Sequence, residues 1–184
     1  MSFPEIRWAR VLVAAAITIS ILAGGYLLYQ RFWVTKPLEM LLDSDPDIEE
    51  TRISRDEQGI MVQVRMRPVK DLAVAYATLE ETLTSRLGNS EYRLVVEDKR
   101  DDKLEEAYHA IHFFVAEAAQ RGNFSEMADR IDSTLGALAF HDYRVTVTQK
   151  AIFVQIFSSD HSRYLYEIVP RFPETDALTK GGGL

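Results

Sequence analysis

An uncharged run of nineteen residues near the amino terminus, residues 11–29, constrains this chain more than any other feature. Its sequence is VLVAAAITISILAGGYLLY. As an α-helix rising about 1.5 Å per residue, the run is roughly 28 Å long, which is close to the thickness of the apolar core of a bilayer. The apolar part of a signal peptide is shorter and ends in small residues, whereas this run ends in bulky ones. The sequence therefore predicts a transmembrane helix at residues 11–29.

Few charges flank the predicted helix. Arg7 and Arg10 precede it and Arg31 and Lys36 follow it, so the positive-inside rule gives only a slight bias in orientation. The leader has only ten residues, which is typical of a signal anchor. We therefore expect residues 1–10 in the cytoplasm and the bulk of the chain in an extracytoplasmic position, in a single-pass protein of a bacterial type of cell membrane.

Small residues recur along the predicted helix. Ala16, Ser20 and Gly24 are spaced four apart, so they share one helix face that another helix could approach closely. This spacing predicts a packing face within the membrane. The alternative is that small residues are simply common in membrane helices.

The charge of the remaining chain excludes several classes of partner. Residues 38–184 carry 17 basic and 27 acidic side chains, and such a surface repels nucleic acid and anionic lipid. The chain has no cysteine, which excludes disulfides, thiolate metal sites and a cysteine nucleophile. The roughly 145 residues from Leu38 onward are enough for one domain with a sizeable core.

Residue patterns predict the elements of that domain. Residues 30–50 are rich in acids and contain two prolines, so we expect a connector that leads to a domain at 51–170. Apolar residues then alternate or recur at helical spacing. The expected elements are strands at 51–55 and 60–67, a helix from 68 to 87, a strand at 92–97, helices at 103–120 and 123–138, and strands at 143–148, 151–157 and 163–169. Residues 171–184 show no periodicity and are expected to be disordered.

The order ββαβααβββ predicts an α+β domain with two layers. In it, three helices cover one face of a mostly antiparallel sheet of about six strands. Residues 60–64 (IMVQV) and 152–156 (IFVQI) match closely. Their surroundings differ, so similar strand patterning explains the match better than duplication does.

One helix flank offers possible metal ligands. Glu105, His109 and His112 lie at i, i+4 and i+7, so two imidazoles and one carboxylate share a helix surface. The alternative is an ordinary half-exposed flank, because the general-base Glu of H-E-x-x-H is missing. We assign no metal and no cofactor to the chain.

The sequence contains no recognisable catalytic motif. Nucleophile-elbow, phosphate-loop and dinucleotide-binding patterns are all missing. Ser158, Ser159 and Ser162 adjoin Asp160 and His161, but their spacing is that of a turn. We therefore predict no catalytic residue and identify no small-molecule substrate.

A second apolar face is predicted on the sheet. Phe153 and Phe157 alternate with Ile152, Val154 and Ile156, so they point away from the helices that cover the first face. We expect Met61 and Val95 of neighbouring strands on the same face. It is either covered by the third helix or the connector, or free to dock a partner protein.

These observations favour a membrane-anchored, non-catalytic interaction or assembly domain that binds another protein or a second copy of itself. Two alternatives stay open. One is a ligand- or metal-binding sensor built around the helix flank with the two histidines. The other is a hydrolase whose site cannot be recognised from one sequence.

Overall fold

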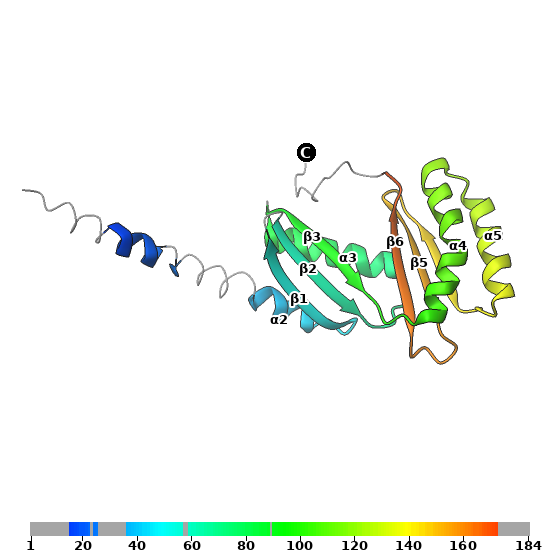
Figure 1. Ribbon diagram of the computed structural model, residues 1–184, viewed down its shortest axis with the longest axis horizontal. Coiled ribbons are helices and arrows are strands. Elements are labelled where there is room, and N and C mark those ends of the chain that lie inside the picture. The colour runs from blue at the N-terminus through cyan, green and yellow to red at the C-terminus, as the bar shows by residue number, and fades with distance from the viewer. Residues whose placement is uncertain (1–14, 23, 26–35, 57–58, 89, 173–184) are drawn as a thin grey trace, which may run out of the picture. The chain divides into compact units, whose positions relative to one another are not determined.

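A computed structural model describes residues 15–22, 24–25, 36–56, 59–88 and 90–172 (Figure 1). The chain divides into two compact units, residues 1–42 and 43–184. In the described part of the first unit, residues 15–22 and 24–25 are helical, and helix α2 (Lys36–Asp43) buries Leu38 and Leu42. Residues 173–184, which make up most of the predicted disordered tail, lie outside the described part.

The described residues do not establish the predicted transmembrane helix. None of the helices in this part of the chain is both long enough and apolar enough to cross a bilayer. Residues 11–14, 23 and 26–29 of the predicted helix lie outside the described ranges. The structure therefore gives this helix no support, and it stays a prediction from the sequence.

The second unit has the predicted order of elements. Its elements are β1 (Ile48–Asp56), β2 (Gly59–Met66), α3 (Leu72–Leu87), β3 (Tyr92–Glu97), α4 (Asp102–Arg121), α5 (Phe124–Ala137), β4 (Tyr143–Val147), β5 (Ala151–Phe157) and β6 (Tyr164–Pro170). Helices begin where short acids cap them: Asp71 accepts from two backbone N–H groups of α3, and Asp101 from one of α4. Gly122, with φ 76°, ends α4 in the left-handed conformation that glycine tolerates. The order ββαβααβββ is confirmed.

The prediction of one mostly antiparallel sheet of about six strands is wrong, because the strands form two three-stranded sheets. In the first sheet, β1 and β2 are antiparallel, and α3 returns the chain so that β3 runs parallel to β2. In the second, β4, β5 and β6 form an antiparallel meander. An isolated antiparallel bridge pairs Lys99, just after β3, with Tyr164 of β6.

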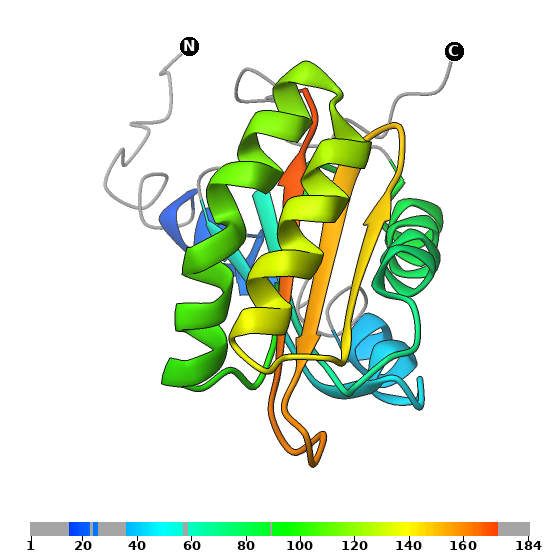
Figure 2. The same cartoon turned by 90° about the vertical axis from the view of Figure 1, so that its right-hand side faces the viewer.

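The prediction of two layers is also wrong for the second sheet, because both faces of β5 are covered. Figure 2 shows α4 and α5 side by side over one face. Their core includes Leu104, Ile111, Val115, Ile131 and Leu135 against Ile152, Val154, Ile156 and Leu165. On the other face, Tyr76 of α3 packs on Phe153 with ring centroids 5.6 Å apart. All seven residues of β5 are consequently buried.

Three polar side chains of the second sheet hold the chain segment that leaves the first. Residues 67–71 connect β2 to α3, and several backbone groups between Met66 and Leu72 find their partners in the second sheet. Five hydrogen bonds satisfy them: Tyr164 Oη donates to Met66 O, Tyr166 Oη donates to Arg67 O (3.0 Å) and accepts from Val69 N (2.7 Å), and Gln155 donates to Val69 O (2.9 Å) and accepts from Leu72 N (2.9 Å). These bonds fasten the two sheets together.

Candidate functional site

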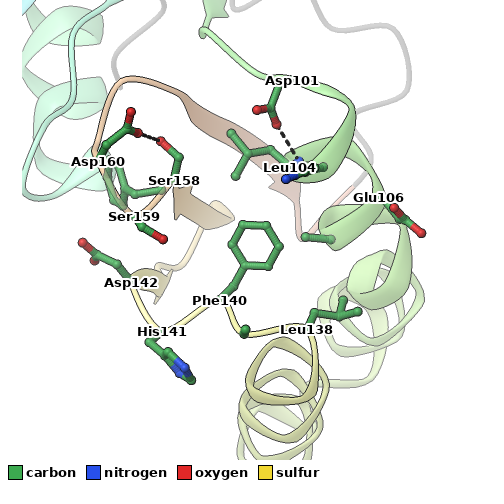
Figure 3. Close-up of a pocket in the computed structure, with 14 residues that line it drawn as sticks. Asp101, Leu104, Glu106, Leu138, Phe140, His141, Asp142, Ser158, Ser159 and Asp160 are labelled. Carbon is green, nitrogen blue, oxygen red and sulfur yellow. Dashed lines mark hydrogen bonds between the residues drawn. The ribbon is translucent and has the colours of Figure 1, made fainter.

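One cavity of the second unit is an open groove of about 870 Å³ (Figure 3). Three segments far apart in sequence form it: the first turns of α4, residues 138–142 after α5, and residues 157–160 after β5. Because α4 and the second sheet share one core, these segments meet at the same end of that layer. Its volume is in the range of sites that hold a drug-sized ligand or part of a peptide.

The groove has an aromatic centre and an acidic rim. Leu104, Leu138, Phe140 and Phe157 supply the apolar part of its lining. In Figure 3 the ring of Phe140 lies in the middle, and the carboxylates of the rim lie around it. These are Asp101, Glu106, Asp142 and Asp160, and Lys103 also lines the groove. An apolar centre within negative charge favours a group that carries both an apolar surface and a positive charge.

Asp160 organises the turn between β5 and β6. Its carboxylate accepts from Ser158 Oγ (2.7 Å), Ser162 Oγ (2.9 Å) and Ser162 N (3.1 Å). Hydrogen bonds to the ionised form stabilise it, so Ser158 first and Ser162 second lower the pKa of Asp160 from 3.8 to about 2. The carboxylate therefore stays charged over the whole physiological range.

This lowered pKa gives a test of the turn. Because the carboxyl titrates at 3.8 when unperturbed, its contribution to folding is fully present above that pH and is lost as the pH falls through about 2. We expect the side-chain carboxyl ¹³C signal of Asp160 to titrate near 2, and Ser158→Ala to move the midpoint toward 3.8. The Ser159→Ala variant serves as control, since the carboxylate bonds in the turn come from Ser158 and Ser162. Equal midpoints in the two variants would contradict the assignment.

His161 lies beside the groove but has no nucleophile arranged for it. Its Nε2 is 2.7 Å from Asp142 Oδ2, and its ring stacks on Phe157 with centroids 5.4 Å apart. The Ser158 and Ser162 hydroxyls bind the Asp160 carboxylate instead of the imidazole. An Asp–His pair without a bonded hydroxyl is not a catalytic triad. These residues build a turn.

The candidate metal ligands Glu105, His109 and His112 make other contacts in the structure. Glu105 pairs with Arg100 at 2.9 Å, and His112 Nδ1 lies 2.6 Å from the carbonyl oxygen of His109. The two imidazole rings stack with centroids 4.8 Å apart. Across the described ranges, no group of three or more His, Cys, Asp or Glu side chains is arranged to hold a metal ion.

Phe153 and Phe157 lie in the interior, 4% and 9% exposed. The predicted cover for their face was the third helix or the connector, and the structure shows the first helix of the domain, α3, against Phe153. Met61 and Val95 belong to the other sheet. The face is therefore filled from within the chain.

The small residues of the first unit are described only in part. Ser20 Oγ donates to Ala16 O at 2.9 Å, within the same helical segment. Ala16 and Ser20 are exposed and Gly24 is half-buried. Their packing against a second helix stays a prediction.

No sequence pattern indicates that Glu106, Phe140 and Asp142 are parts of one site. Each lies in a different local pattern, and only the fold brings them to one groove. Comparison of the chain with protein-family models, curated proteins and solved structures found no match. Its function has to follow from the chemistry of its own residues.

Proposed function

We propose that this chain is a membrane-tethered, non-catalytic domain that binds another protein through the groove. The observation that carries the proposal is the arrangement in Figure 3, an aromatic ring in the centre of a groove of about 870 Å³ with four carboxylates on its rim. This arrangement matches a protein segment that bears basic side chains next to an apolar one.

A binding role agrees with how the polar groups near the groove are used. Asp160 and two serines bond to one another in the turn, and His161 bonds to Asp142. Catalysis by a side chain needs a nucleophile or base within hydrogen-bond reach of its partner and free to transfer a proton. The two serine hydroxyls bond to Asp160 Oδ1 and the imidazole pairs with Asp142, so the hydroxyl and imidazole groups of the turn favour recognition over chemistry.

The membrane tether rests on the uncharged run at residues 11–29. We place the amino terminus in the cytoplasm and the groove outside it. A tether confines the domain to a layer next to the bilayer, which raises its effective concentration toward neighbouring membrane proteins. Modest affinity in the groove is then sufficient for function.

Photo-crosslinking of the full chain in its own membranes tests the proposal. A benzophenone amino acid at Leu138, in the groove and 43% exposed, should capture a protein. The same amino acid at Val147, 37% exposed at the end of edge strand β4, is the matched control and should capture none. The chain should also sediment with the membranes when detergent is omitted.

Reversing one charge on the rim of the groove tests the proposal a second time in the same crosslinking experiment. Glu106→Lys changes an exposed rim residue of α4, so it should leave the fold intact and lower the yield of the Leu138 adduct several-fold. Equal adducts from Leu138 and Val147, or none from Leu138, would refute binding through the groove. A full-length chain in the high-speed supernatant would refute the tether.

A further inference from the structure

We propose that two copies of the chain pair along strand β1, antiparallel, about a two-fold axis at Thr51. This contact goes beyond binding in the groove, because it lies on the other sheet and involves a second copy. Figure 1 shows β1 at the edge of the β1–β2–β3 sheet. Within the described ranges, β1 pairs with β2 on one side and with no strand on the other.

The edge of β1 is long, and from Glu50 to Asp56 its ladder with β2 is regular. The strand has nine residues, IEETRISRD, without proline or glycine. Exposed edges of this length pair readily with another strand unless a bulge, a proline or repelling charges prevent it. The other edge strands are shorter: β3 has six residues, β4 five and β6 seven, and β6 ends in a proline. β1 is therefore the edge best suited to a partner strand.

The charges of β1 select one register for self-pairing. In a two-fold antiparallel pair, the residue on the axis faces itself, and residues equally distant on either side face each other. An axis at Thr51 places Glu50 opposite Arg52 of the second copy, and this ion pair occurs twice. Opposite charges directly across a strand pair are stabilising, and like charges are destabilising.

Neighbouring registers are worse. An axis at Arg52 places two guanidinium groups opposite each other, and an axis at Ile53 places Glu50 opposite Asp56. Both arrangements bring like charges together. An axis at Ser54 places Arg52 opposite Asp56, but it pairs only residues 52–56 of β1, whereas the axis at Thr51 pairs residues 48–54. The alternation of acid and base in β1, together with the length of the paired segment, therefore favours the Thr51 register.

The half-exposed face of the first sheet continues this pattern. Arg65 of β2 lies 2.8 Å from Glu50 on one side and 2.9 Å from Glu97 of β3 on the other. Negative and positive charges alternate along the row Glu97, Arg65 and Glu50. Arg52 of the second copy continues this alternation across the dimer interface. The Glu50 and Arg52 side chains are 41% and 57% exposed and lie 2.8 Å apart as an ion pair within one copy, so in the dimer Arg52 exchanges this contact for Glu50 of the second copy.

The contact is short. A register shift between Ile48 and Glu50 interrupts the regular ladder at the start of β1. Only a few hydrogen bonds can therefore form across the two-fold axis. Pairing of this length is weak in free solution and becomes significant when both copies are held in one membrane.

Single-cysteine variants test the register, because the natural chain has no cysteine. The full-length Glu50→Cys and Arg52→Cys variants are co-expressed and oxidised mildly in their own membranes. In the proposed dimer, the new thiols face each other at a strand-pair distance that a disulfide can span. The remaining Arg52 and Glu50 still form one ion pair, so the contact is retained. We expect the mixture to give at least several-fold more linked dimer than either variant alone.

Glu50→Cys mixed with Arg55→Cys is the register control and should link no better than the single variants. A second measurement uses energy transfer between labelled full-length copies in phosphatidylcholine vesicles. There, Arg52→Glu should abolish transfer and Arg55→Glu, with the same change of charge in the same strand, should preserve it. Equal yields in all mixtures, no linkage, or equal effects of the two charge reversals would overturn the proposal.

Discussion

Gln155→Leu is expected to lower the free energy of unfolding by about 3 kcal/mol, although it replaces a polar side chain in an apolar strand with an apolar one of similar size. Gln155 is 1% exposed, and its amide bonds Val69 O and Leu72 N, both at 2.9 Å. Leucine can bond neither group. Each buried backbone group left without a partner costs about 1–3 kcal/mol, and the gain from burying leucine offsets only part of this. Urea unfolding followed by circular dichroism measures the loss.

The matched control for this substitution lies in the first sheet. Gln63 occupies the same place in IMVQV that Gln155 occupies in IFVQI, on the middle strand of its own sheet. Gln63 is half-exposed, so Gln63→Leu should change stability by less than about 0.5 kcal/mol. Similar losses from the two variants would mean that the amide of Gln155 does not hold the two sheets together.

The order of elements could be predicted because it depends on local patterns. Apolar residues at helical spacing, with Asp101 before and Gly122 after, mark α4 from sequence alone. The partner of each strand could not be predicted in the same way. Nothing in the sequence of β3 indicates that it pairs parallel to β2, since that pairing follows from the path of α3 between them.

The double burial of β5 was visible in the sequence and was misinterpreted. AIFVQIF is a nearly continuous apolar run, which is typical of a strand covered on both faces. If the run is interpreted as a strand with one covered face, Phe153 and Phe157 lie on the other face, which a partner or another element has to cover. The single glutamine within the run was the better signal, because a polar side chain at such a position needs buried partners. Here those partners are backbone groups of residues 69 and 72.

The groove was not predictable, for a physical reason. Phe140 follows α5, Asp160 lies in a turn, and Glu106 belongs to α4, and each has an ordinary local role. Only the packing of α4 and α5 on the second sheet brings them together. A site can be recognised from sequence when its residues share one helix or strand, as His109 and His112 do. Such a pattern does not show that the residues have a function.

Arg100→Leu is expected to lower the free energy of unfolding by about 2–3 kcal/mol. Arg100 bonds Asp98 (2.7 Å), Glu167 (2.8 Å) and Glu105 (2.9 Å), and thereby joins the β3–α4 connection to β6 and α4. The hydrogen bonds that Arg100 donates to Asp98 in particular raise the pKa of Arg100, so its charge is permanent. The Asp98 side chain is only 6% exposed, and removal of the guanidinium leaves a buried carboxylate without its counter-ion. Because the Arg100 side chain is 33% exposed, water recovers part of the loss.

A double variant separates loss of the ion pair from loss of packing. Asp98→Asn removes the stranded charge and keeps an oxygen that can accept from Tyr166 N, which Asp98 Oδ2 binds at 2.7 Å. Arg100→Leu combined with Asp98→Asn should therefore be at least 1 kcal/mol more stable than the sum of the single variants predicts. Arg144→Leu, on the exposed side of β4, is the control and should change stability by less than about 0.5 kcal/mol. If the stability losses of the two single variants simply add up in the double variant, the guanidinium stabilises the fold by packing contacts alone. In an ion pair, by contrast, the cost of removing one residue depends on whether the other is present.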